Sequence, residues 1–439
     1  MKKRMKEFQP AKWNEPILMT MTSPGERGIR VPCADDEIEA INFTGQIPAE
    51  LRRTKRPELP ELSQPQVYRH FLHLSQETMG QAVTPDISQG TCTMKYSPLV
   101  NEQLCADPNI ADMHPYQPVS TMQGTLKIIW ELEKCLQEIS GMDAFTFQPG
   151  GGSQAIYTNV CIIRAFHEAN GNGPQKNEII TTACSHPADA AAPNTCGYKV
   201  IQLYPEENGY PSVEALKAVV SEHTAGLMIT NPEDTGIYNP HMKEFVEIIH
   251  SVGGLCAYDQ ANANGILGVA RAKEAGFDLC HFNLHKTFGS PHGSNGPGCG
   301  ASGVRKGLEQ FFPVPAVTFD GENYGLNYGL PLSIGKIRSF LGNIPVVVRS
   351  YAWIAAMGAD GLRKTAEISV LNNNYMTKKM CEIKGIGLAY NTDVPWHLEQ
   401  TRYTCEEMFQ ATGVTGSDVR RRISDYGLQS YHESHYPVL

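Results

Sequence analysis

The sequence lacks the features of several large classes of protein. Its 439 residues carry a net charge of −9, which argues against a general role in binding nucleic acid or membrane surfaces. The longest apolar run, residues 345–359, is too short to cross a bilayer and is interrupted by Arg349. The first seven residues are basic but lead into no apolar stretch, so we expect no signal peptide. We therefore expect a cytoplasmic protein with neither nucleic acid nor membrane as a partner.

The cysteines also lack an organised pattern. All 12 are scattered along the chain, and none belongs to a Cys-x-x-Cys pair. Such pairing is typical of zinc sites, and regular spacing is typical of disulfide frameworks. We therefore expect reduced thiols and no metal site. The composition is otherwise ordinary for a globular protein, with 41% hydrophobic and 19% charged residues.

Strand and helix patterns alternate through the middle of the chain. Strands interleaved with helices predict an α/β fold with a mainly parallel sheet that helices cover on both faces. Ligands of such sheets bind at the carboxyl ends of the strands. The candidate strands are residues 144–147, 178–182, 198–203, 226–230, 255–259 and 279–283, and the candidate helices are residues 122–140, 154–169, 213–222 and 242–252.

The length and the changes in pattern predict three parts. Residues 1–100 form an extended and partly helical segment, with one helix near residues 66–76. Residues 101–315 form the large α/β domain. Residues 316–439 hold two long helical patterns, 344–358 and 362–384, followed by a smaller α+β domain.

Two residues with chemical potential stand at predicted strand ends. Lys286 closely follows the strand 279–283, and burial there favours the neutral amine that imine formation needs. Asp259 ends the strand 255–259, where a buried carboxylate is costly without a cationic partner. One helix and one strand fit between them, so both side chains can face one pocket. Taken alone, Asp259 is equally suited to cap a helix.

A glycine-rich turn and two further polar residues complete the set. Residues 148–155, Gln-Pro-Gly-Gly-Gly-Ser-Gln-Ala, follow a strand and open a helix, where free N–H groups favour a phosphate. His186 can lie on a cofactor ring, and Thr230 can donate to a ring hydroxyl. Each alone has a plainer reading, as a tight turn or a half-buried histidine. Together with Lys286 and Asp259 they suit pyridoxal 5'-phosphate, with its aldehyde, pyridine nitrogen and phosphate.

Longer motifs resemble a known family. Residues 283–288, Asn-Leu-His-Lys-Thr-Phe, with Gly-Pro-Gly at 296–298, resemble the signature of the glycine-cleavage-system P-protein, the decarboxylating glycine dehydrogenase. The similarity is greatest to subunit 2 of the two-subunit bacterial form. It extends past residue 380 and includes residues 15–16, 90–98, 113–117, 258–264, 333–340 and 370–372.

The resemblance implies a fold-type I enzyme, similar to aspartate aminotransferase, with a seven-stranded sheet and an active site near a subunit interface. It implies Lys286 as the Schiff-base lysine, Asp259 against the pyridine nitrogen and His186 on the ring. The other residues that it places around the cofactor are Gly151, Gly152, Ser153, Gln154, Thr230, Asn262 and His285.

The resemblance also implies the reaction and the partners. The family releases the carboxylate of glycine as carbon dioxide and passes the aminomethyl group to lipoylated H-protein. A homologous subunit 1 and H-protein are the expected partners, in a dimer or heterotetramer. Arg338 is a candidate for holding the substrate carboxylate, with a surface ion pair as the equal alternative. Lys95 is a second candidate, although its loop can equally be a structural turn.

The chain departs from the family pattern around the expected site. The four-glycine tract is Gly293-Ser-Asn-Gly296, and the pattern His-Gly-Thr-Asn-Pro is His186-Pro-Ala-Asp-Ala190. A Gly-Glu pair is Ala155-Ile156, and Asp-Gly-Ala-Asn is Asp259-Gln-Ala-Asn262. Such changes narrow a pocket, so the alternative is a paralogous enzyme acting on another amino acid as a decarboxylase, lyase or aminotransferase. The chain also ends before the family does, which predicts an abbreviated or truncated last domain.

Overall fold

The computed structural model describes residues 13–29, 31–77, 98–290, 296–390, 396–424 and 426. Lys95 and the substituted glycine tract at Gly293 and Ser294 lie outside these ranges. The described residues divide into two compact units, residues 13–77 with 424 and 426, and residues 98–423. The three-part division expected from the sequence stays a prediction.

The first unit holds short helical turns and one longer helix. His70 and His73, one turn apart on that helix, both contact the Glu15 carboxylate, and His70 Nδ1 lies 2.9 Å from Glu15 Oε2. The Trp13 ring stacks on His73, with 3.9 Å between ring centroids. This cluster joins the start of the unit to its main helix. The elements are η1 (Leu18–Thr20), α1 (Asp36–Glu39), η2 (Phe43–Gln46), η3 (Ala49–Leu51) and α2 (Gln64–Glu77).

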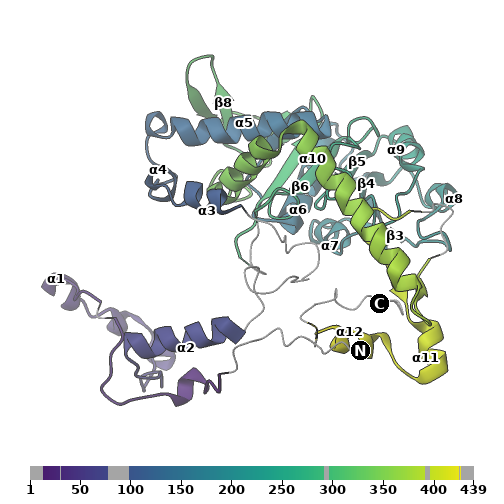
Figure 1. Ribbon diagram of the computed structural model, residues 1–439. Helices are drawn as coiled ribbons and strands as arrows, with labels where there is room; N and C mark the ends of the chain where they lie inside the picture. The colour runs from purple at the N-terminus through teal and green to yellow at the C-terminus, as the bar shows by residue number, and fades with distance from the viewer. Residues whose placement is uncertain are drawn as a thin grey trace. The chain divides into compact units, whose positions relative to one another are not determined.

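A seven-stranded sheet lies at the centre of the second unit (Figure 1), in the order β1-β7-β6-β5-β4-β2-β3. The strands from β6 to β3 run parallel, and β7 is antiparallel to both of its neighbours. This confirms the predicted mainly parallel sheet. The strands are β1 (Ala144–Thr146), β2 (Glu178–Thr182), β3 (Lys199–Leu203), β4 (Thr224–Thr230), β5 (Leu255–Asp259), β6 (Leu279–Asn283) and β7 (Gly300–Val304).

Helices cover both faces of this sheet. Alternate residues of a strand point to opposite faces, so Ile179 and Ile180 of β2 belong to two separate apolar clusters. The Ile179 cluster includes α6 (Gly152–Ala169) and α7 (Ala188–Thr195). The Ile180 cluster includes α5 (Gln123–Ser140), α8 (Val213–Lys217), α9 (Met242–Ser251) and α10 (Ile344–Cys381).

The longest helix, α10, bends at Gly358, where the backbone adopts φ 62° (Figure 1). This bend separates the two helical patterns that the sequence predicts. Small elements complete the unit: α3 (Leu99–Cys105), α4 (Pro108–Ala111), η4 (Val119–Thr121), η5 (Glu309–Phe311), the β8 (Ala316–Phe319) and β9 (Tyr324–Asn327) hairpin, the pair β10 (Gly387–Leu388) and β11 (Tyr403–Thr404), α11 (Glu406–Thr412) and α12 (Gly416–Ser424).

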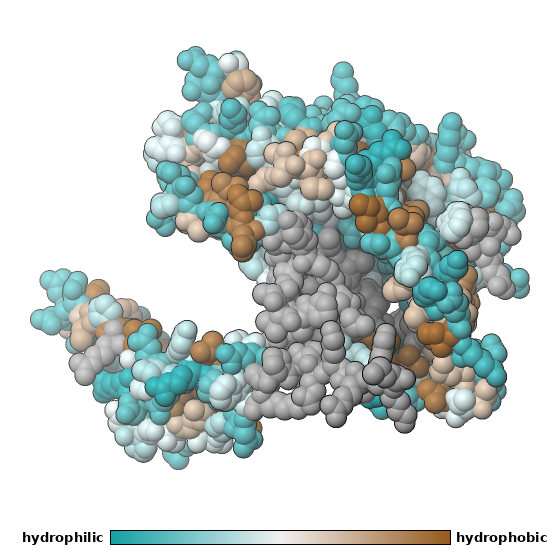
Figure 2. Space-filling view, in the orientation of Figure 1, coloured by the Kyte–Doolittle hydropathy of each residue, from teal (hydrophilic) through white to brown (hydrophobic). Residues whose placement is uncertain are grey.

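The surface of the second unit mixes polar and apolar side chains (Figure 2). The exposed apolar residues of α10 include Ile368, Leu371 and Met376. Apolar colour also lies over the region where this helix runs (Figure 2). No helix in the described part of the chain is both long enough and apolar enough to span a membrane.

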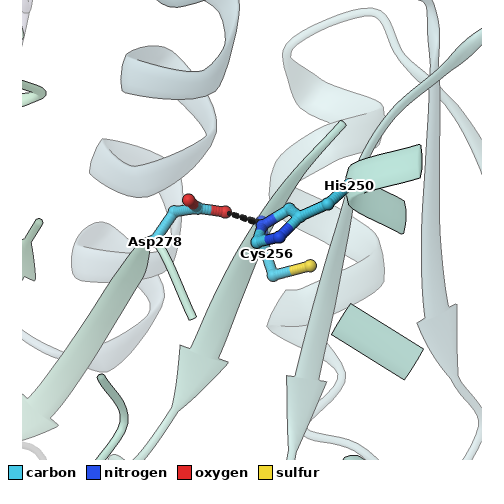
Figure 3. Close-up of side chains that lie close together, drawn as sticks. All are labelled: His250, Cys256 and Asp278. Carbon is cyan, nitrogen blue, oxygen red and sulfur yellow. Dashed lines mark hydrogen bonds and ion pairs between the residues drawn. The ribbon is translucent and has the colours of Figure 1, made fainter. Parts of the chain in front are cut away.

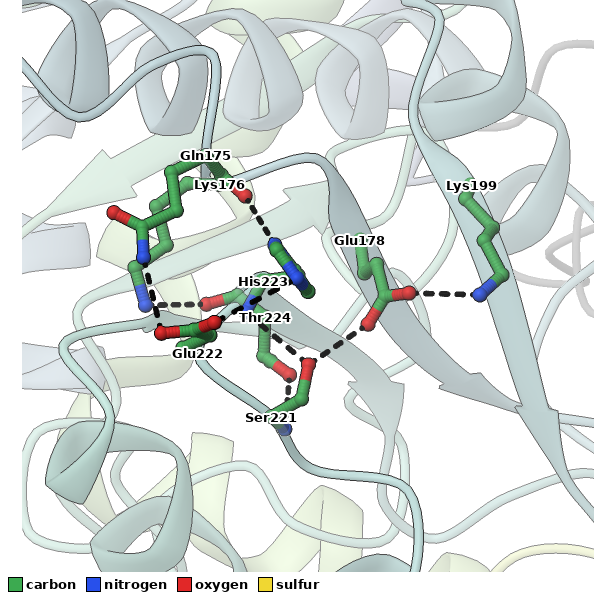
Figure 4. A network of polar contacts seen from close by, with 8 residues as sticks. All are labelled: Gln175, Lys176, Glu178, Lys199, Ser221, Glu222, His223 and Thr224. Carbon is green, nitrogen blue, oxygen red and sulfur yellow. Dashed lines mark hydrogen bonds and ion pairs between the residues drawn. The ribbon is translucent and has the colours of Figure 1, made fainter.

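A polar network closes the amino ends of β2, β3 and β4 (Figure 4). The Lys199 ammonium pairs with Glu178 at 2.8 Å, and Ser221 Oγ donates to the other Glu178 oxygen. Lys176 Nζ donates to the carbonyl of Thr224 at 3.1 Å, and burial lowers the pKa of Lys176. These contacts satisfy polar groups at the amino ends of the strands. Ligands of such sheets bind at the opposite edge, at the carboxyl ends.

Candidate active site

Three neighbouring strands bring the predicted residues together at their carboxyl ends. Thr230, at the end of β4, pairs with Asp259 at the end of β5, and Asp259 pairs with His281 on β6. Lys286 follows β6 by three residues and is 4% exposed, as is Asp259. The expected meeting of a lysine and an aspartate at successive strand ends is therefore present in the fold.

One oxygen of the Asp259 carboxylate has no hydrogen-bond partner among the described residues. This is the buried Oδ2, whereas Oδ1 accepts from the Ala261 N–H at 2.8 Å. Burial raises the pKa of Asp259, but His281, His186 and Lys286 more than offset burial and hold it below its ordinary value. Such an oxygen is suited to accept from the N–H of a bound cation.

Lys286 is fixed by the turn that follows β6. Its backbone N–H donates to the Asn283 carbonyl at 3.0 Å. Next to it, the ring of His285 lies against the backbone of Cys299, whose N–H donates to His285 Nδ1 at 3.1 Å. The side chain of Lys286 is buried, and its charge helps to lower the pKa of Asp259.

The glycine-rich turn packs closely against this edge of the sheet. Gly152 begins α6, and a Cβ atom there would lie 2.6 Å from Asn283 Nδ2. The turn is closed by the Gln154 side chain, which accepts from the Gly150 N–H at 2.6 Å. The start of an 18-residue helix, including Gly151 and the exposed Ser153, therefore lies beside the end of β6. Its free N–H groups suit a phosphate.

Arg338 lies against the same turn. A Cβ atom on Gly150 would be 2.7 Å from Arg338 Nη1. The exposed Arg338 also lines a cavity of about 410 Å³, whose apolar wall includes Met113, Met122 and Phe340. Its proposed contact with a substrate carboxylate stays a prediction, and Lys95 lies outside the described residues.

Three other predicted residues have definite partners. The exposed His186 accepts from the Ala188 N–H at its Nδ1 atom, at 3.1 Å. The Thr230 hydroxyl, expected near a ring hydroxyl, donates to Asp189 Oδ2 at 3.3 Å. The Asn262 amide donates to Glu399 Oε1 at 3.0 Å. The roles assigned to these residues at a cofactor stay predictions.

Sequence reasoning missed several groups around Asp259. Asp189, in the first turn of α7, is 1% exposed and accepts a hydrogen bond from Thr230. His281 lies within β6, and its Nε2 atom is 3.2 Å from Asp259 Oδ1. A histidine inside a strand pattern is visible in the sequence and could have marked this residue. Burial raises the pKa of Glu399 to about 7, and only the fold brings it to Asn262.

A second polar cluster lies at the opposite edge of the sheet. His250, Cys256 and Asp278 present ligand-type atoms within 4.8 Å of one another (Figure 3). Asp278 is already engaged, because it accepts from His250 at 2.8 Å and the Cys256 N–H at 2.7 Å and pairs with Arg305. Burial raises the pKa of the Cys256 thiol well above its ordinary value. These contacts describe a structural ion pair with a neutral thiol.

Known proteins with similar sequences identify the family. The family described as aminotransferase class-V matches residues 150–313. A probable glycine dehydrogenase (decarboxylating) subunit 2 from Pyrococcus furiosus is 43% identical over 427 residues, which cover 96% of this chain and 83% of that protein. The chain belongs to the glycine dehydrogenase (decarboxylating) subunit 2 family. A protein of the same name from Caldanaerobacter subterraneus subsp. tengcongensis is 38% identical and covers 94% of this chain and 83% of its own length.

Solved structures support the same fold for this family member. A crystal structure of glycine decarboxylase (P-protein) in an inhibitor-bound form has a TM-score of 0.75 at 18% identity, with 93% of this chain and 94% of that chain covered. An alanine–glyoxylate aminotransferase from Nostoc sp. has a TM-score of 0.56 at 14% identity, with 81% and 88% covered. The fold-type I prediction is confirmed.

Proposed function

We propose that this chain decarboxylates glycine and transfers the aminomethyl group to lipoylated H-protein, as subunit 2 of a glycine-cleavage P-protein, with pyridoxal phosphate as its cofactor. The observation that carries the proposal is the 43% identity over 96% of the chain to a relative named for this activity. It is supported by the placement of Lys286 and Asp259 at neighbouring strand ends.

The residues at the carboxyl edge fit this cofactor. The buried Asp259 Oδ2 is an acceptor without a partner among the described residues, which a pyridinium N–H would satisfy. The start of α6 offers N–H groups beside glycines that leave room for a phosphate. When bound, pyridoxal phosphate supplies an aldehyde for the substrate amine and a conjugated ring that accepts the electron pair of the breaking bond.

Each side chain then has a role in the reaction. Lys286, buried just after β6, would hold the cofactor through its Nζ atom. Asp259 would accept a hydrogen bond from the ring nitrogen and would favour its protonated form. His186 would contact the ring. Arg338 is the proposed partner of the substrate carboxylate, which it would bind and orient.

The overall step balances with the lipoyl disulfide as the oxidant. The bond between Cα and the carboxylate breaks, and carbon dioxide leaves. The aminomethyl carbon forms a bond to one lipoyl sulfur, and the other sulfur leaves with the disulfide electron pair and takes up a proton. The substrate carbon is oxidised and the disulfide is reduced.

We further propose that the chain works with a homologous subunit 1, in a dimer or heterotetramer, in the cytoplasm. The proposal of subunit 1 is supported by the name of the relatives, which calls them subunit 2. H-protein is included because the aminomethyl group needs a lipoyl acceptor.

The second candidate is a paralogous fold-type I enzyme that acts on another amino acid as a decarboxylase, lyase or aminotransferase. It is favoured by one observation. Asp189 lies beside Asp259 and is bonded to Thr230, at a position where the family pattern has asparagine. A carboxyl group in place of an amide would change the hydrogen-bonding groups that the site presents.

The test is a spectral titration of the cofactor-loaded protein with glycine and other small amino acids. Exchange of bicarbonate into glycine is then measured with lipoylated H-protein, with and without subunit 1. A glycine-dependent spectral change together with exchange supports the proposal. Bound cofactor that ignores glycine and responds to another amino acid supports the paralogue instead.

A further inference from the structure

Two carboxyl groups are buried together beneath the candidate cofactor site. Asp189, in the first turn of α7, is 1% exposed, and Asp259, at the end of β5, is 4% exposed. Thr230 links them, because its hydroxyl donates to Asp189 Oδ2 at 3.3 Å and it pairs in register with Asp259 on the neighbouring strand, so the two carboxyl groups lie close together. Two ionised carboxylates at that separation repel each other and cannot form a hydrogen bond, so the arrangement requires an explanation.

The hydrogen bonds around the pair account for only half of its oxygens. Thr230 Oγ1 donates to Asp189 Oδ2 at 3.3 Å, and the Ala261 N–H donates to Asp259 Oδ1 at 2.8 Å. Asp189 Oδ1 and Asp259 Oδ2 are buried and have no hydrogen-bond partner in the part of the chain that the structure describes. One proton on the pair converts a carboxylate into a donor and satisfies both carboxyl groups.

We propose that Asp189 is a positioning residue: it carries a proton at neutral pH, donates a hydrogen bond to Asp259, and thereby holds the Asp259 carboxylate in place for the cofactor. The inference deepens the proposed function, since it rests on Asp259 as the partner of the pyridine nitrogen. The proton itself belongs to the protein whether or not cofactor is bound.

The surroundings decide which carboxyl group holds the proton. His281, His186 and Lys286 face Asp259 and favour its anion. Asp189 instead faces Asp259 itself and the buried Glu233. Burial and the Asp259 charge therefore raise the pKa of Asp189 well above its ordinary value, whereas the pKa of Asp259 is lowered.

This arrangement leaves Asp259 able to serve a ligand. An ionised carboxylate offers about four lone-pair positions, so Asp259 can accept from Ala261, Asp189 and a cofactor N–H together. A fixed carboxylate loses less freedom when the cofactor binds, which favours binding. Asparagine in place of Asp189 keeps a donor but carries no titrating proton, and leucine keeps neither.

Infrared spectroscopy of the full-length protein tests the proton directly. A protonated carboxyl group absorbs apart from the amide and carboxylate bands. The difference between wild type and Asp189→Asn at pH 7 is expected to show the loss of one such band, with and without cofactor. Asp143→Asn, at an exposed carboxylate paired with Lys273, is expected to show no such loss. An Asp189→Asn spectrum identical to wild type in this region overturns the proposal.

Cofactor release tests the positioning role. Asp189→Asn is expected to release pyridoxal phosphate within about threefold of the wild-type rate, because a donor to Asp259 remains. Asp189→Leu is expected to release it about tenfold faster, as for loss of a hydrogen bond to a charged group. Equal release by Asp189→Leu and wild type, with circular dichroism unchanged, overturns the positioning role. If wild type binds no cofactor, the proposed function fails, and the infrared band still decides whether Asp189 is protonated.

Discussion

His281 and Asp259 face each other across neighbouring strands, with His281 Nε2 3.2 Å from Asp259 Oδ1. Both side chains are buried, and burial lowers the pKa of His281. The histidine therefore occupies the side of the carboxylate that also accepts from the Ala261 N–H. The other oxygen, Oδ2, is left for both a ligand and Asp189.

Replacement of Asp259 tests most directly whether its carboxylate serves the cofactor. Asp259→Asn keeps the shape of the side chain but cannot balance a protonated ring nitrogen. We expect the rate of bicarbonate exchange to fall by about 100–1,000-fold, the range for loss of one preorganised charge interaction at a reacting centre. Asp143→Asn is the matched control and should retain the wild-type rate. A wild-type rate of bicarbonate exchange in Asp259→Asn would show that Asp259 does not serve the cofactor.

Lys286→Ala should abolish the covalent attachment of the cofactor. Wild type treated with borohydride and digested should carry the reduced cofactor on the peptide that contains Lys286, as detected by mass spectrometry. The variant should carry none and should lose the corresponding visible absorbance. Lys273→Ala, which removes an exposed lysine 3.1 Å from Asp143, should behave as wild type. Label on another lysine in wild type would contradict the assignment.

Much of the sheet was predictable because several of its strands carry β-branched or aromatic residues between turn signals. The predicted strands 178–182, 255–259 and 279–283 agree with β2, β5 and β6. β7, Gly-Ala-Ser-Gly-Val, was missed, because glycine and serine give no strand signal. It is a strand because it packs antiparallel between β1 and β6. The helix α7 was missed because Pro193 interrupts its pattern.

The candidate site was predictable to the extent that single residues mark strand ends. Lys286 and Asp259 were candidates because both stand near predicted strand ends that are separated by one helix and one strand. Asp189 and Glu399 were not, because their approach to the site depends on how separate elements pack. Asp189 reaches Thr230 across the gap from α7 to β4, and Glu399 reaches Asn262 from 137 positions further along the chain.

The segment after α10 is held at this edge by a close backbone contact. Gly236 has φ +74°, and a Cβ atom there would lie 1.8 Å from the carbonyl oxygen of Gln400. The Leu398 N–H donates to the Gly236 carbonyl at 2.8 Å, and Arg402 pairs with Asp234 at 2.9 Å. The packing therefore depends on the absence of a side chain at Gly236.

Gly236→Ala is expected to destabilise the protein more than a matched glycine replacement. Gly253 has φ +77° but no atom within 4 Å of its Cβ position, so Gly253→Ala measures the backbone strain alone, about 1–2 kcal/mol. Gly236→Ala should cost about 1–3 kcal/mol more, the range for overpacking. Urea unfolding of both variants gives the comparison. If both variants lose the same free energy of unfolding, residues 398–402 move away from the new side chain without an energetic cost.

The ion pair at the opposite edge predicts a pH dependence of stability. The hydrogen bond to Asp278 raises the pKa of His250 above its ordinary value of about 6.5. A raised histidine pKa stabilises the folded state fully below the unfolded pKa, and this contribution is lost as the pH rises through the folded pKa. Because the His250 side chain is 40% exposed, the contribution is below about 1 kcal/mol.

His250→Gln should therefore lower Tm by about 1–2 °C at pH 5.5, and by less at pH 9. His241→Gln, at an exposed histidine 3.9 Å from Glu244, is the control and should show a smaller change in Tm at both pH values.

Added zinc distinguishes an ion pair from a metal site, because an ion that binds only the folded protein raises Tm. Arg305 already pairs with Asp278, and burial keeps the Cys256 thiol protonated. Added zinc should therefore change the Tm of neither wild type nor His250→Gln. A zinc-dependent rise in wild type that His250→Gln abolishes would instead make His250, Cys256 and Asp278 a metal site.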